Sequence, residues 1–299
     1  MLNLVHHPAY DAQFDSDHRF PMGKYTALMQ ELEHSGLLSR SVVHVPEMPN
    51  PLTLNRAHDA DYVRSVFDAS VDPKIERLIG FPVSRKVADR ALLATAGTML
   101  AAELALKHGI ACNTAGGSHH AKRAHGAGFC TLNDVAVAAL NLLDQGLAKH
   151  ILVVDLDVHQ GDGTAEILAN VPDVFTLSVH SEKNFPTRKE RSNLDVPLPD
   201  GAGDDDYLAI LRDTFPSIES QFKPDFVFYN AGVDVHAKDR LGRLALSNGG
   251  IAARDDAVFS RFAAKNIPVC GVIGGGYSKD LEALAKRHAL LFEAAALYC

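Results

Sequence analysis

Short apolar runs recur along the chain and alternate with longer segments in which apolar residues repeat at helical spacing. The short runs are rich in valine, isoleucine and leucine, and they predict strands at 41–45, 110–113, 151–155, 174–179, 226–230 and 269–273. Because these runs contain few polar positions, they are typical of parallel strands that are covered on both faces.

Apolar residues three and four positions apart predict helices between these runs, at 85–108, 133–145, 205–221, 252–265 and 279–297. Gly109 and Gly146 directly follow the first two helices, as glycine often does at a helix end. The alternation of strands and helices predicts an α/β fold with three layers, in which a mainly parallel sheet lies between two layers of helices. In such folds, ligands bind at the carboxyl ends of the strands.

Composition narrows the class of protein further. The chain has 299 residues, of which 46% are hydrophobic, and no low-complexity segment, repeat or linker divides it. We therefore expect a single domain over 1–299. The net charge of −8 comes from acidic residues spread along the chain, which argues against nucleic acid as a direct ligand.

Cysteine usage and hydropathy indicate the cellular compartment. The four cysteines, Cys112, Cys130, Cys270 and Cys299, form no Cys-x-x-Cys pair, which is typical of reduced thiols. The first residues carry no basic leader, and no apolar run approaches the roughly 20 residues of a membrane span. We therefore expect a soluble, cytoplasmic protein with no membrane partner.

Polar residues with catalytic potential gather where four of the predicted strands end. They are His119 and His120 after 110–113, Asp155, Asp157 and His159 at the end of 151–155, Asp234 after 226–230, and Tyr277 after 269–273. One such residue alone would more often be a helix cap or a satisfied core residue. Four coincident strand ends favour a functional site instead.

Asp155, Asp157 and His159 alternate with apolar residues, so in an extended segment their side chains would share one face. Two carboxylates this close repel each other unless a cation lies between them. Oxygen and imidazole ligands suit Zn²⁺, with Fe²⁺, Co²⁺ or Mn²⁺ as alternatives. A catalytic site needs three protein ligands, and we assign Asp157, His159 and Asp234. The competing interpretation is a helix-capping cluster, with Asp234 as a turn residue.

The tandem His119 and His120 could act beside a metal as general base, general acid and electrostatic stabiliser. Each needs an acidic partner, and Asp155 and Asp162 are the nearby carboxylates that remain. The three glycines before Tyr277 are not followed by the Lys-Ser/Thr of a phosphate loop, which argues against phosphate binding. We expect instead that they place the Tyr277 hydroxyl where it can donate to a developing oxyanion. The alternatives are a polar loop for the histidine pair and a packed aromatic for Tyr277.

Five motifs occur in an order and approximate spacing found in one known family. They are Gly116-Gly117-Ser118-His119-His120, Gly128-Phe129-Cys130, Asp155-Leu156-Asp157-Val158-His159-Gln160-Gly161-Asp162-Gly163, Ala231-Gly232-Val233-Asp234 and Gly274-Gly275-Gly276-Tyr277. Together they resemble the arginase/deacetylase superfamily, and within it the histone deacetylases and their bacterial relatives. Gln160, where many relatives have a second histidine, makes the chain look most similar to the class IV branch and its bacterial counterparts.

The resemblance implies the arginase/deacetylase fold, with a sheet of about eight strands. It implies that Asp157, His159 and Asp234 bind zinc. It also implies that His120 is the general base and then the acid, and that His119 is its electrostatic partner. Asp155 and Asp162 would orient His119 and His120, and Tyr277 would polarise the scissile carbonyl. Gly128 and Phe129 look like a wall of the acyl-lysine channel. A structural potassium ion is implied beside Asp155, Asp157, His159, Ser178 and Val179.

The function implied is zinc-dependent hydrolysis of N-acyl amides, which removes acetyl or longer acyl groups from lysine side chains of proteins or peptides. Hydrolysis of acetylated polyamines or other small amides would use the same catalytic residues. Two further alternatives are a ureohydrolase with two manganese ions and a reader that binds acyl-lysine without turnover. The first would need more aspartates, and the second would not need two acid/base histidines and an oxyanion donor.

Overall fold

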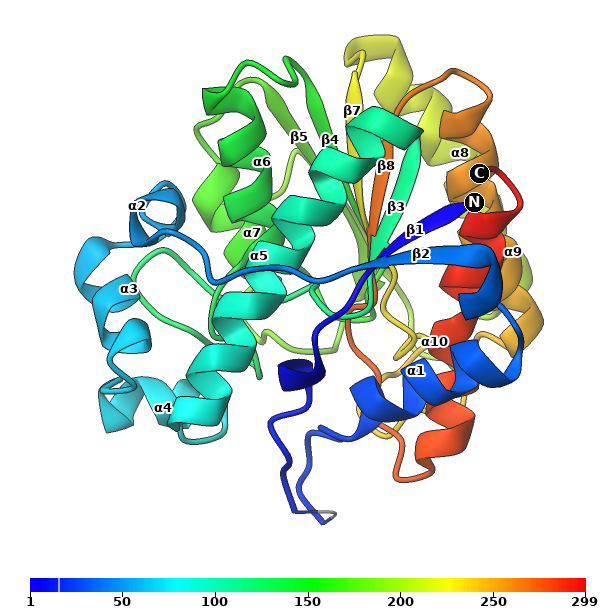
Figure 1. Cartoon of the computed structure of the whole chain (residues 1–299). Helices are drawn as coiled ribbons and strands as arrows, with labels where there is room; N and C mark the ends of the chain where they lie inside the picture. The colour runs from blue at the N-terminus through cyan, green and yellow to red at the C-terminus, as the bar shows by residue number, and fades with distance from the viewer. Residues whose placement is uncertain (16) are drawn as a thin grey trace.

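Eight strands lie side by side in one sheet, and every neighbouring pair is parallel (Figure 1). The computed structural model describes residues 1–15 and 17–299. The strands are β1 (Leu2–Val5), β2 (Ser41–His44), β3 (Ile110–Asn113), β4 (Ile151–Asp155), β5 (Val174–Ser181), β6 (Leu194–Leu198), β7 (Phe226–Asn230) and β8 (Val269–Val272). Their order across the sheet is β2-β1-β3-β8-β7-β4-β5-β6. The predicted α/β class and parallel sheet are thereby confirmed.

The two edges of the sheet depart from the sequence pattern. Strand β2 was expected to be covered on both faces, and this is wrong, because it lies at one edge and exposes 39% of Val42 and 42% of Val43. At the other edge, β6 was not predicted, since Asp195 and Pro197 interrupt its apolar pattern. Strand β1 was also missed, because Asn3 interrupts its short apolar run, although all four of its residues are buried between β2 and β3.

Helices cover both faces of the sheet (Figure 1). On one face α5 (Arg85–His108) packs against α6 (Asp134–Asp144), and α7 (Asp162–Leu168) follows beside α6. On the other face α1 (Lys24–His34), α10 (Leu281–Ala296), α9 (Asn248–Ala263) and α8 (Asp204–Gln221) pack in that order. Three short helices, α2 (Pro51–Leu54), α3 (Ala60–Phe67) and α4 (Pro73–Ile79), lie beside α5 and α6.

The helix predictions succeeded where capping signals frame an apolar repeat. Helix α5 has the predicted bounds, because the Ser84 hydroxyl accepts a hydrogen bond from the Val87 N–H at its start and Gly109 ends it at a φ of 86°. Helices α1 to α4 and α7 were not predicted. Throughout the described residues, no helix is long and apolar enough to cross a membrane.

The strand order explains why four strand ends can supply one site. Strands β3, β8, β7 and β4 are consecutive across the middle of the sheet, and all point the same way. Their carboxyl ends therefore lie along a single edge. These are the four strands after which the candidate catalytic residues follow in the sequence.

Candidate active site

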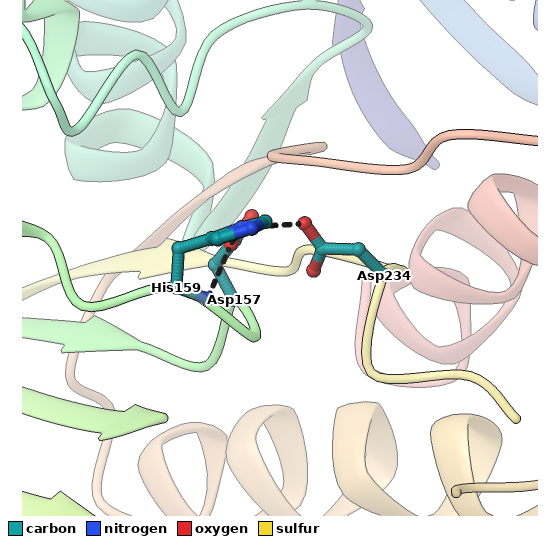
Figure 2. A group of neighbouring side chains, drawn as sticks. All are labelled: Asp157, His159 and Asp234. Carbon is teal, nitrogen blue, oxygen red and sulfur yellow. Dashed lines mark hydrogen bonds and ion pairs between the residues drawn. The ribbon is translucent and has the colours of Figure 1, made fainter. Parts of the chain in front are cut away.

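Asp157, His159 and Asp234 form a buried triad beyond the ends of β4 and β7 (Figure 2). Their ligand atoms all lie within 4.8 Å of one another. The His159 Nδ1 atom is 3.0 Å from Asp157 Oδ1 and 3.2 Å from Asp234 Oδ2, so the imidazole lies between the two carboxylates. The three residues assigned to a metal from the sequence are therefore brought together.

The chemistry of the triad suits a divalent cation. Burial, together with the nearby Asp157 carboxylate, raises the pKa of Asp234 to about 7. The Asp234 Oδ2 atom is buried and, among the described residues, has no donor other than the His159 imidazole at 3.2 Å, while Asp157 Oδ2 accepts the backbone N–H of Gly275 at 2.7 Å. Two crowded carboxylates and one imidazole are a common ligand set for a catalytic metal, and a cation between them would relieve their repulsion.

The predicted geometry of 155–159 is wrong, although the residues do share one site. Strand β4 ends at Asp155, and the chain then bends instead of continuing extended. The Asp155 carboxylate accepts the Asp157 N–H at 3.2 Å, and the Asp157 carboxylate accepts the His159 N–H at 2.9 Å. Each aspartate therefore closes a turn through the N–H two residues ahead of it, which holds the next polar side chain toward the site.

Gly275 allows the loop after β8 to pass directly over the two metal-site carboxylates. A Cβ atom at this position would lie 2.0 Å from Asp234 Oδ2 and 2.6 Å from Asp157 Oδ2. No side chain fits there unless these carboxylates move. At Gly275 the missing side chain thus allows a close approach of the backbone to the two aspartates.

Replacing Gly275 with alanine is expected to weaken divalent-metal binding at least about tenfold, because the added methyl group displaces the two carboxylates and they no longer point at the same metal position. Chelator competition on the purified protein measures this affinity. Gly249→Ala is the matched control, because a Cβ there would meet only the Ser247 hydroxyl, at 3.4 Å. Equal metal affinity in the two variants would contradict this account of Gly275.

His119 and His120 each bind a separate carboxylate and face each other. The His119 Nδ1 atom is 2.7 Å from Asp155 Oδ2, and the His120 Nδ1 atom is 2.6 Å from Asp162 Oδ1. The two Nε2 atoms are 3.1 Å apart. Asp155 and Asp162 thus lie where the sequence analysis expected the acidic partners of the histidines.

The two histidines have opposite charge preferences. Burial lowers the pKa of His119, but the carboxylates of Asp155 and Asp157 outweigh burial and raise it to about 9. Burial and the charge on His119 lower the pKa of His120 to about 4, although Asp162 opposes them. At neutral pH this arrangement favours a charged His119 beside a neutral His120. A neutral imidazole whose Nε2 atom carries no proton can accept one there.

A cavity of about 310 Å³ lies beside His120. Its lining residues are Arg19, Leu78, Ile79, Gly80, His120, Gly128, Phe129, His159, Asn184, Phe185, Leu241 and Tyr277. Gly128 packs against the His120 ring, since a Cβ at Gly128 would lie 2.6 Å from His120 Cδ2. The Phe129 ring lies 5.7 Å from the Tyr277 ring, between centroids, so both expected wall residues line the cavity.

The sequence analysis did not identify one further residue of the cavity wall, Phe185. The Phe185 ring stands edge-on to His120, with 4.8 Å between the centroids, and 45% of the residue is exposed. It lies in the loop between β5 and β6, which has no strand or helix pattern of its own. A phenylalanine in a segment with no strand or helix pattern is the sequence signal that could have indicated Phe185 as a wall residue.

Three further residues position the catalytic groups and were also missed. Asp134 accepts the N–H groups of Gly117 and Ser118, at 3.1 and 2.8 Å, and so fixes the loop that ends in the histidine pair. Asn230 donates to Asp155 Oδ1 at 2.9 Å. Asp239 accepts the Tyr277 N–H at 2.7 Å. Asn230 is the last residue of an apolar strand, and a polar residue there is a usable signal.

Ser178 and Val179 lie in β5, next to the end of β4. Ser178 pairs with Asp155 in the register of the two strands, and its hydroxyl is 3.0 Å from His180 Nδ1. The segment implied to hold potassium is therefore adjacent to the metal site. The potassium ion itself stays a prediction.

Comparison with known proteins gives a consistent result. The family model described as histone deacetylase domain matches residues 18–294. An uncharacterised protein of Picosynechococcus sp. is 49% identical over 292 residues, which cover 98% of this chain and 97% of that protein. A probable deacetylase of Archaeoglobus fulgidus is 32% identical over 276 residues, which cover 84% and 74%. The crystal structure of the HDA15 HD domain superposes with a TM-score of 0.84 at 22% identity, covering 98% and 90%, and supports the fold.

These findings establish the class of protein, a hydrolase of α/β architecture that acts on amide bonds. The chain belongs to the histone deacetylase family, so the resemblance drawn from the five motifs is confirmed. Acetylated compounds are the substrates of this family in general. The family is also generally metal-dependent, and the triad could hold a metal.

Proposed function

We propose that the protein hydrolyses N-acyl amides on lysine side chains of proteins or peptides, with a divalent metal bound by Asp157, His159 and Asp234. The observation that carries the proposal is the contact of this triad with two histidine–aspartate pairs, with His120, His159 and Tyr277 lining one cavity. We also propose that residues 1–299 act as a single catalytic domain.

Zn²⁺ is the proposed metal, and Fe²⁺ is the proposed alternative in the cell, because both accept a mixed carboxylate and imidazole set. When bound, such an ion supplies a Lewis acid for the amide carbonyl and lowers the pKa of a water molecule. The potassium ion proposed beside β5 would be structural.

The residues of the chain would then move the protons. The neutral His120 accepts a proton from the attacking water at Nε2 and later gives it to the departing amine. His119 remains charged, because Asp155 and Asp157 surround it, and stabilises the negative charge that forms nearby. Asp162 accepts the proton on His120 Nδ1, so His120 Nε2 carries no proton of its own and can accept one, with His119 Nε2 3.1 Å away.

Tyr277 would supply the hydrogen bond to the carbonyl oxygen. Burial and the carboxylates of Asp234 and Asp157 raise the pKa of its hydroxyl well above the usual value, so it stays protonated and able to donate. The backbone N–H of Tyr277 is held by Asp239, which fixes the residue at the end of the glycine loop.

The cavity lining favours acyl-lysine over acetylated polyamines. Its outer part is apolar, with Leu78, Phe185 and Leu241, and its charged side chain at the mouth is the exposed cation Arg19. Among the described lining residues, none is a carboxylate that would attract a polycation. An uncharged acyl chain with the lysine methylenes suits such walls better.

The test is release of lysine from peptides that carry acetyl, trifluoroacetyl or long-chain acyl groups, after the protein has been loaded with Zn²⁺ or Fe²⁺. Turnover that a hydroxamate inhibits, and that a chelator abolishes, is the expected result. Acetylated polyamines are assayed in parallel. Turnover of polyamines alone would contradict the substrate class but leave the metal chemistry in place, whereas metal binding with no turnover of any amide would favour a non-catalytic reader.

A further inference from the structure

A cluster of completely buried polar side chains lies beside the strand ends that carry the metal site, and the proposed mechanism does not use it. Arg254 and Asp255 belong to α9, and Tyr229 belongs to β7. All three have no exposed surface. A buried guanidinium is costly unless its hydrogen bonds are made, so its contacts indicate what it does.

Each of the three side-chain nitrogens of Arg254 donates at least one hydrogen bond. The Nε atom donates to Asp255 Oδ1 at 2.9 Å, and Nη2 contacts the same oxygen at 2.8 Å. The other acceptors are backbone carbonyls, Gly232 O at 2.6 Å and Leu156 O at 3.2 Å from Nη1, and Ala231 O at 3.4 Å from Nη2. The Tyr229 hydroxyl donates to Asp255 and completes the cluster.

These carbonyls belong to the two loops that carry the metal-site aspartates. Leu156 directly precedes Asp157, and Gly232 lies two residues before Asp234. A single nitrogen, Nη1, bonds to both loops. Arg254 therefore links the end of β4 to the end of β7 at the point where each delivers a carboxylate.

General stability does not explain this arrangement. A buried ion pair contributes little stability compared with apolar residues of similar size. A planar guanidinium, by contrast, has donors in a fixed geometry that an ammonium group cannot reproduce. Arg254 uses this geometry to bind two backbone segments, which favours a role in fixing the distance between them.

We propose that Arg254 is a positioning residue for the metal centre, which sets the distance between the Asp157 and Asp234 carboxylates by holding the backbone that precedes each of them. The inference rests on the proposed metal site. It assigns a role to a residue of α9 that touches neither metal nor substrate.

The experiment measures Zn²⁺ affinity by chelator competition, together with the visible spectrum of the Co²⁺-loaded protein and the melting temperature of the metal-free protein. Arg254→Lys is expected to bind Zn²⁺ about 10- to 100-fold more weakly, the usual effect of losing a residue that orients metal ligands. Its Co²⁺ spectrum should also change. Arg261→Lys is the matched control, because Arg261 lies in the same helix and pairs with Glu219 at 2.9 and 2.7 Å.

A second variant separates positioning from folding. The double replacement Arg254→Met with Asp255→Leu removes both buried charges together, so the melting temperature should fall only by the loss of the hydrogen bonds to the carbonyls and to Tyr229, while the Zn²⁺ affinity is still lost. Either folded variant with wild-type affinity and an unchanged Co²⁺ spectrum overturns the inference while the metal site stands. Loss of the fold in both variants also overturns it, in favour of a structural role. A wild-type protein that binds no divalent metal overturns the metal site and the inference together.

Discussion

Replacing His120 with alanine is expected to lower kcat for deacylation about 100- to 10,000-fold, the range typical of a lost general acid/base group. The reason lies in the charge distribution of the pair. His119 takes the proton because two carboxylates surround it, and His120 is left neutral with its Nε2 atom 3.1 Å from His119 Nε2. Steady-state kinetics on an acyl-lysine peptide measures the loss.

Metal content separates this effect from damage to the metal site. His120 is not a member of the triad, so the variant should hold as much Zn²⁺ as the wild-type protein, measured by elemental analysis. His34→Ala, at the exposed end of α1, is the control for removal of a histidine and should leave kcat unchanged. Near-normal kcat in a metal-loaded His120→Ala variant would assign the proton transfer to another group.

The sequence predicted the parts of this site that depend on strand ends. Strands β3, β4, β7 and β8 are buried runs with clear boundaries, so the polar residues that follow them could be recognised and grouped. The same approach could not predict β1 or β6. Asp195 and Pro197 interrupt the apolar pattern of β6, and Asn3 interrupts that of β1.

The residues that support the site were harder to predict than those that form it. Arg254 lies near the start of the helix predicted at 252–265, where an arginine is normally exposed, and only the packing of α9 shows that it is buried. Asp134 is the first residue of α6 and looked like an ordinary helix-capping residue. Their roles depend on tertiary contacts with loops 16 to 98 residues away in the chain, and the local sequence pattern does not indicate these contacts.

The Tyr277→Phe replacement is expected to lower kcat about 100- to 1,000-fold, the scale of one missing hydrogen-bond donor to an oxyanion. Only the hydroxyl is removed, so the ring should keep its contacts with Phe129 at 5.7 Å and with the edge of His159 at 6.1 Å. KM should change little, because the hydrogen bond strengthens as negative charge develops on the carbonyl oxygen.

The control for this variant is Tyr298→Phe, which removes a hydroxyl bonded to Asp256 on the surface. It should leave kcat and Zn²⁺ content unchanged. Tyr277→Phe should keep its Zn²⁺ as well, since the hydroxyl is not part of the triad. A higher KM with kcat preserved would mean that Tyr277 only lines the channel. The metal and His119 would then stabilise the oxyanion without it. A fall in kcat with full metal content would instead place the hydroxyl at the reacting carbonyl, opposite the two carboxylates that keep it protonated.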